Sequence, residues 1–83
     1  MERERLINTM VAALPTLRAS LNLTQENLAS ELGVSRQTIV SIENGKQKLS
    51  WSIFLALMFV FNLQQNSKRI LEAYDLKIGN TRE

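Results

Sequence analysis

Residues 24–45 read Thr-Gln-Glu-Asn-Leu-Ala-Ser-Glu-Leu-Gly-Val-Ser-Arg-Gln-Thr-Ile-Val-Ser-Ile-Glu-Asn-Gly, and this stretch decides the fold. Thr24 is a good helix N-cap, because its side-chain oxygen can accept a backbone N–H that the first helical turn leaves free. Leu28 and Leu32 then recur at helical spacing, which predicts a first helix of about two turns. Gly33 ends that helix, since glycine enters the left-handed conformation of a helix C-terminus without steric cost.

A second helix follows after a turn of a few residues. Ser35 can cap it, and the pattern predicts that it covers residues 35–44. Ile39 and Ile42 fall on one face and are expected to pack against the rest of the domain. The other face carries side chains at the i, i+3, i+4 and i+7 positions, namely Gln37, Val40, Ser41 and Asn44. This second face is free to contact a partner.

The stretch resembles the helix-turn-helix of the lambda repressor/Cro-type (XRE-like) transcriptional regulators. The family pattern has a polar residue opening the first helix, a leucine, a small residue where the helices cross, a glycine at the turn and aliphatic residues after it. The matching residues are Gln25, Leu28, Ala29, Leu32, Gly33, Val34, Ile39 and Ile42. The resemblance implies an all-α, lambda-repressor-like domain of five helices that binds specific double-stranded DNA and regulates transcription, most often as a repressor.

Two positions depart from the family pattern. Asn27 stands where a glutamate would complete a capping box with Thr24, so we expect a weaker box. Leu49 stands where the family often has proline, so we expect a less rigid entry to the next helix. The resemblance also implies that Arg18 pairs with Glu43 and supports the end of the second helix.

Length and composition limit the other possibilities. The 83 residues predict one small domain with a net charge of +2, and the absence of cysteine and histidine argues against disulfides, a metal site or any other cofactor. The longest apolar run, residues 53–61, is too short to span a bilayer, and the expected location is cytoplasmic. A small-molecule ligand is not expected.

The residues before the motif predict helix. Apolar residues recur at spacings of three and four along residues 1–22, but Pro15 would forfeit a hydrogen bond in a helix interior. We therefore expect a break or sharp kink near Leu14, with residues 3–13 forming a helical extension in front of the family's first helix. The expected inward side is formed by Leu6, Met10, Val11, Leu14, Leu17, Arg18 and Leu21.

Two more helices are predicted after the motif. Ser50 can cap a helix over residues 51–62, and Ser67 can cap a last helix over residues 67–78, with a polar linker between them and a tail at residues 79–83. The inward face of the first is expected to hold Trp51, Phe54, Leu55, Met58, Phe61 and Asn62, and that of the second Ile70, Leu71, Tyr74 and Ile78.

The resemblance implies that helix 35–44 enters the DNA major groove. Side chains expected to read base edges are Arg36, Gln37, Val40 and Ser41. Those expected to hold phosphates are Gln25, Ser35, Asn44, Lys46 and Lys48. Without the register match to the family, the same residues would be interpreted as an ordinary solvated helix face and a soluble loop.

The far side of helix 51–62 is also apolar, and something must cover it. Its residues are expected to be Ile53, Ala56, Leu57 and Val60. Burial of one such side chain stabilises by about 1.5–3 kcal/mol, so a stripe left exposed to water would favour association. The N-terminal extension, the last helix or a second copy could cover it, and we expect a homodimer.

The sequence also bears on three functions other than DNA binding. An enzyme is not expected, because none of the carboxylates forms a convincing pair and the three glycines are scattered. An antitoxin-like protein that binds a partner protein and regulates its own promoter is the main alternative. A structural bundle that never touches DNA is the third possibility.

Overall fold

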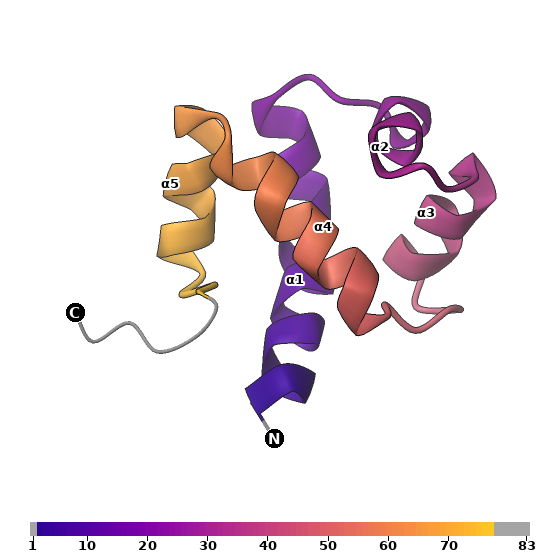
Figure 1. The fold of residues 1–83 in the computed structure, drawn as a ribbon, viewed down its shortest axis with the longest axis horizontal. Helices are drawn as coiled ribbons and strands as arrows, with labels where there is room; N and C mark the ends of the chain where they lie inside the picture. Colours follow the sequence, from indigo (N-terminus) through magenta and orange to yellow (C-terminus); the bar gives the residue numbers. More distant parts are fainter. Residues whose placement is uncertain (1, 78–83) are drawn as a thin grey trace.

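The computed structural model describes residues 2–77, and in this range the chain forms five helices and no strand. The all-α fold with five helices is therefore confirmed. In Figure 1, α4 crosses in front of α1, with α2 and α3 on one side of this pair and α5 on the other. The helices are α1 (Glu2–Ser20), α2 (Gln25–Leu32), α3 (Arg36–Glu43), α4 (Trp51–Asn62) and α5 (Gln65–Ala73).

Of the break or sharp kink expected near Leu14, the break is wrong, because α1 continues through Pro15. Pro15 is exposed, and it removes the backbone hydrogen bond that the carbonyl of Val11 would otherwise accept. Leu14 and Leu17 on either side of Pro15 are fully buried. Burial along one continuous helix thus offsets the cost of the proline, and residues 3–13 are the first part of α1 instead of a separate extension.

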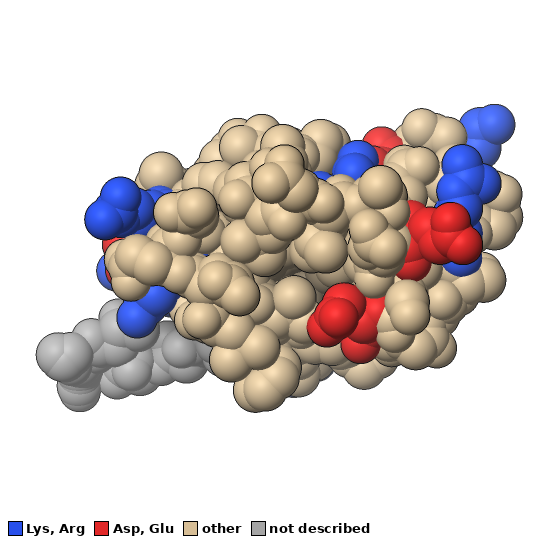
Figure 2. All heavy atoms as spheres, turned by 90° about the horizontal axis from the view of Figure 1, so that it is seen from above, with Lys and Arg blue, Asp and Glu red and all other residues tan. Residues whose placement is uncertain are grey.

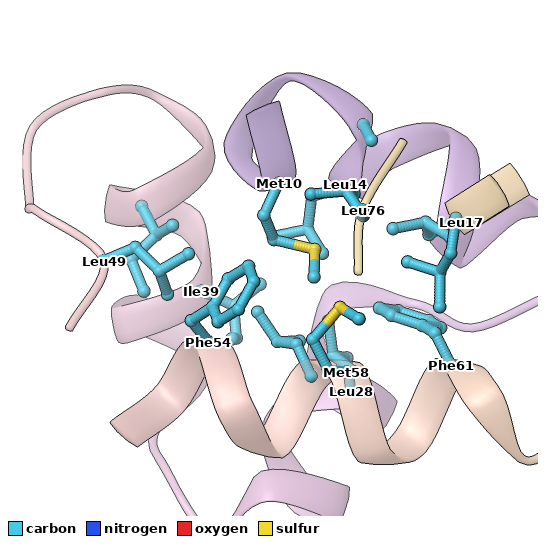
Figure 3. Close-up of a cluster of buried hydrophobic side chains, with 14 of the residues drawn as sticks. Met10, Leu14, Leu17, Leu28, Ile39, Leu49, Phe54, Met58, Phe61 and Leu76 are labelled. Carbon is cyan, nitrogen blue, oxygen red and sulfur yellow. The ribbon is translucent and has the colours of Figure 1, made fainter. Parts of the chain in front are cut away.

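The core lies between α1 and α4 and extends to the other helices. Figure 3 shows side chains of α1, among them Met10 and Leu17, pointing toward Phe54 and Phe61 of α4. Each of these four residues has 0% exposure. The remaining buried apolar residues are Leu6, Ala13, Leu14, Leu28, Ala29, Ile39, Ile42, Leu49, Leu57, Met58, Leu71 and Leu76.

Phe54, Met58 and Phe61 are buried as predicted, but the inward face of α4 is rotated from the one expected. Leu57, expected on the far side, is fully buried, whereas Leu55, expected in the core, is 38% exposed. Asn62 is exposed, and Trp51 is only partly buried. The expected interface set of Ile53, Ala56, Leu57 and Val60 therefore does not form the exposed side of the helix, and Ile53 and Val60 pack against the core.

The last helix begins and ends earlier than expected. Ser67 lies inside α5 and is buried, and its hydroxyl donates to the carbonyl of Phe61 at 2.7 Å, so it joins α5 to the end of α4 instead of capping a helix. The helix ends at Ala73, and Asp75 has φ of 59°. Ile78 and the expected tail at residues 79–83 lie outside the described residues.

The first turn of α1 contacts the start of α4. The guanidinium of Arg3 lies 4.6 Å from the ring centroid of Trp51, and that ring stacks on Phe54 with centroids 4.7 Å apart. Arg5 donates a 2.8 Å hydrogen bond to Glu2, and this bond lowers the pKa of the Glu2 carboxyl and raises that of Arg5. Because both of these groups are exposed, their ion pair adds little stability.

In Figure 2, charged side chains lie at the left end and over the right half of the face seen from above. A broad area in the middle of this face is uncharged. None of the described helices is both long and apolar enough to cross a membrane.

The rotation of α4 leads to a prediction about two leucines on the same helix. Leu57→Ala should lower the free energy of unfolding by about 2–5 kcal/mol, because it opens a cavity in the core. Leu55→Ala is the matched control and should cost less than about 1 kcal/mol, since Leu55 already meets water. Urea unfolding at low protein concentration measures both. Equal losses, or a larger loss for Leu55→Ala, would contradict the observed rotation.

Candidate nucleic-acid interface

The candidate interface begins with α2, whose first turn is closed by a capping box. The Thr24 hydroxyl accepts from the backbone N–H of Asn27 at 2.9 Å, and the Asn27 side chain accepts from the Thr24 N–H at 3.4 Å. Asparagine is shorter than the usual glutamate, and the second of these bonds is correspondingly long. On the inner side of α2, Leu28 and Ala29 are buried, which lets α3 pack closely.

A tight turn then sets the start of α3. Gly33 has φ of 74°, the left-handed conformation expected from the sequence, and the next residue's N–H bonds back to the carbonyl of Ala29 at 3.0 Å. Ser35 caps α3 by accepting from the N–H of Thr38 at 3.2 Å. These bonds therefore restrict the orientation of α3 relative to α2.

The outer face of α3 presents the residues predicted to read bases. Arg36 and Gln37 are exposed, and Val40 and Ser41 are half-buried, whereas the inner face buries its two isoleucines. The Gln37 amide donates to the Ser41 hydroxyl at 3.1 Å, a bond that spacing alone did not indicate. Because this bond restrains the amide, Gln37 presents its remaining polar atoms in a limited range of directions.

The far end of α3 is held by a cluster of polar bonds around the Glu43 carboxylate. Arg18 donates to it from Nε at 2.7 Å and from Nη2 at 3.0 Å, which is the expected ion pair in bidentate geometry. Gln25 donates to the same carboxylate at 3.0 Å. A further N–H of Arg18 donates to the carbonyl of Leu23 at 3.1 Å. We call Arg18, Gln25 and Glu43 the Glu43 clamp.

The loop between α3 and α4 folds back on the end of α3. The backbone N–H groups of Lys46 and Gln47 donate to the carbonyl of Ser41 at 2.9 and 3.2 Å, and Gly45 has φ of 78°. Leu49, which stands at the family's proline position, is 2% exposed and anchors the loop in the core. Lys46 and Lys48 are exposed on this anchored loop.

The structure brings most of the predicted contact residues onto one continuous region, made of the start of α2, the outer face of α3 and the loop after it. Ser35 and Asn44 lie at the two ends of α3 as its caps. Gln25 differs from the other predicted contact residues, because its side-chain amide already donates a hydrogen bond to Glu43. Arg18 neutralises the Glu43 carboxylate at the end of α3. The exposed charges of α3 and its loop are therefore the positive ones of Arg36, Lys46 and Lys48.

The sequence of this chain matches a known protein family. A family model described as helix-turn-helix matches residues 16–62, which include all of α2, α3 and α4. An uncharacterized HTH-type transcriptional regulator of Methanocaldococcus jannaschii is 49% identical over 47 residues, which cover 57% of this chain and 71% of that protein.

A second relative gives the same result over a similar segment. It is an uncharacterized HTH-type transcriptional regulator of Archaeoglobus fulgidus, 47% identical over 45 residues, which cover 54% of this chain and 63% of that protein. No solved structure gives a significant match.

The Glu43 clamp leads to a prediction about stability. Glu43→Ala should lower the free energy of unfolding by about 1–3 kcal/mol, because it leaves Arg18, whose side chain is only 19% exposed, without its partner. The loss in the double variant with Arg18→Ala should be smaller than the sum of the two single losses. Thermal and urea unfolding measure these values. Glu72→Ala, an exposed change on α5, is the control and should stay within about 0.5 kcal/mol. Unchanged melting in both single variants would show that the clamp is not structural.

Proposed function

Because this chain belongs to the helix-turn-helix family of transcription regulators, we propose that it binds specific double-stranded DNA sequences by placing α3 in the major groove. The observation that carries the proposal is the exposed outer face of α3, with Arg36 and Gln37, next to a loop that carries Lys46 and Lys48. A B-form major groove admits one α-helix and offers a distinct donor and acceptor pattern for each base pair.

The N-terminal part of α3 supplies the base-reading groups. Arg36 can donate two hydrogen bonds to the O6 and N7 atoms of a guanine, and Gln37 can bind the N6 and N7 atoms of an adenine. The bond from Gln37 to Ser41 orients the amide before binding, so less conformational entropy is lost when a base pairs with it. Val40, one turn further on, suits contact with a thymine methyl group.

The residues around α3 supply the phosphate contacts. Lys46 and Lys48 lie on the anchored loop after the helix, and Asn44 caps its end. Ser35 caps the N-terminus of α3, and the N–H groups that the cap leaves free suit a phosphate. Gln25 can use its carbonyl oxygen or its second N–H while its first N–H stays on Glu43.

We further propose that the bound protein represses transcription. Occupying a promoter requires nothing beyond the DNA interface, whereas activation needs a second surface that recruits the polymerase. The relatives are named as transcriptional regulators, which favours this function over the antitoxin-like alternative. Transcription in vitro from a template with the selected site should fall as protein is added. A rise in transcript would contradict repression while leaving DNA binding intact.

The proposed base contacts can be tested by selecting bound sequences from a random duplex pool. Arg36→Ala and Gln37→Ala should each relax the preference at one position and cost about 1–3 kcal/mol of binding free energy on the selected site. Fluorescence anisotropy measures the loss. Both side chains are exposed, so the melting temperature should stay unchanged and serves as the control for folding. If neither variant alters the selected motif, these residues do not read bases.

The proposed phosphate contacts predict a different response. Lys46→Ala and Lys48→Ala should weaken binding to all sequences alike, and each should reduce the slope of log K against log salt by about 0.9. Lys68→Ala on α5 is the matched control, because that lysine is exposed on a helix away from the interface, and it should leave the slope unchanged. An equal effect of all three variants would point to general charge attraction instead of defined contacts.

A further inference from the structure

The first turn of α1 carries two arginines that face different sides of the molecule. Arg3 and Arg5 are two residues apart, which is about 200° around a helix. Arg5 binds Glu2 at 2.8 Å, and this bond and the nearby charge of Asp75, just after α5, raise the pKa of its guanidinium. Arg3 instead lies over the ring of Trp51 at the start of α4. Carboxylates therefore balance the charge of Arg5, whereas an uncharged ring contacts Arg3.

Stability of the fold does not explain the position of Arg3. A cation in the first turn of a helix opposes the macrodipole, which favours acidic side chains there. Arg3 is exposed, and a cation–π contact at an exposed site is weak, so the two effects largely cancel. Within residues 2–77, no carboxylate forms an ion pair with Arg3. Its positive charge is available to a partner of opposite charge.

The face of α1 that carries Arg3 continues to the loop proposed to hold phosphates. Ile7 lies one turn after Arg3 on this face, and with Asn8 and Val11 it forms one wall of a hollow of about 290 Å³. The opposite wall comes mainly from the loop after α3, including Lys48. In Figure 1, the first turns of α1 and α4 lie close together, on the side of the molecule away from α5. Arg3 thus extends the positively charged edge that begins at the loop.

We propose that Arg3 is a further DNA contact, which binds a backbone phosphate beyond those held by the loop after α3. This inference rests on the proposed function of α3, and it places the first turn of α1 beside the flanking DNA. Successive phosphates of one strand rise by about 3.4 Å along the axis, so a strand held at Lys48 brings further phosphates toward Arg3.

Trp51 prepares Arg3 for this contact. The indole ring stacks on Phe54, which is fully buried, so the surface under the guanidinium is fixed by the core. The ring restrains the long side chain of Arg3 before DNA binds, which reduces the entropy lost on binding. A cation–π contact needs no acceptor atom, so it leaves the N–H donors of the guanidinium for phosphate oxygens.

The test measures binding to the selected duplex at several salt concentrations by fluorescence anisotropy. Arg3→Ala should weaken binding to all sequences alike and reduce the slope of log K against log salt by about 0.9, because one phosphate contact is lost. Arg3→Lys should keep the slope, since lysine supplies the same charge. Arg5→Ala is the matched control, because it removes the same side chain from the same turn on the side toward Asp75, and it should leave the slope unchanged.

A methylphosphonate scan of the duplex then locates the contact. Neutralising one flanking phosphate should weaken binding of the wild type and of Arg5→Ala but not of Arg3→Ala, which has already lost that contact. If Arg3→Ala instead altered the response only at the phosphates held by Lys46 and Lys48, Arg3 would act through the loop and the contact would be excluded.

The outcome also separates this inference from the proposed function. Equal slopes for Arg3→Ala and Arg5→Ala, with the selected motif still dependent on Arg36, would overturn the Arg3 contact alone. A wild-type chain that binds no duplex would overturn both proposals.

Discussion

The position of the candidate reading helix depends on the Glu43 carboxylate. α2 and α3 have eight residues each, too few to be stable as isolated helices, so their geometry must come from the contacts they make. Apolar packing between them leaves some freedom for sliding, because aliphatic contacts have little directionality. The bidentate bond from Arg18 and the bond from Gln25 are directional, and they join α1, α2 and α3 at a single carboxylate that is 7% exposed. Burial costs hydration energy, but it restricts this carboxylate to one arrangement.

The parts of the fold that could be predicted from the sequence are those that local chemistry determines. Thr24, Gly33, Ser35 and Ser50 each act at a helix end, where a hydroxyl or a positive φ is needed whatever surrounds it. The bounds of α2, α3 and α4 follow from them. The helix break expected at Pro15 does not occur. The cost of a proline can be offset by the burial of the residues around it, and that burial is seen only in the folded core.

The rotation of α4 could not be predicted because its sequence carries little information about phase. All but two of its twelve residues are apolar, so several faces look equally suited to the core. The same limit applies to the candidate interface. Spacing identified which side chains lie on the outer face of α3, but not that Gln37 binds Ser41 or that Gln25 binds Glu43. The first bond depends on the direction in which the Gln37 side chain points. The second joins the start of α2 to the end of α3, which meet only in the folded domain.

The largely apolar α4 both supplies core residues and carries exposed apolar ones. Leu57 and Phe59 are only two residues apart, yet the first is fully buried and the second is 68% exposed, because successive positions on a helix point in different directions. Changes on the inner side act on stability, whereas a change at Phe59 leaves the core in place.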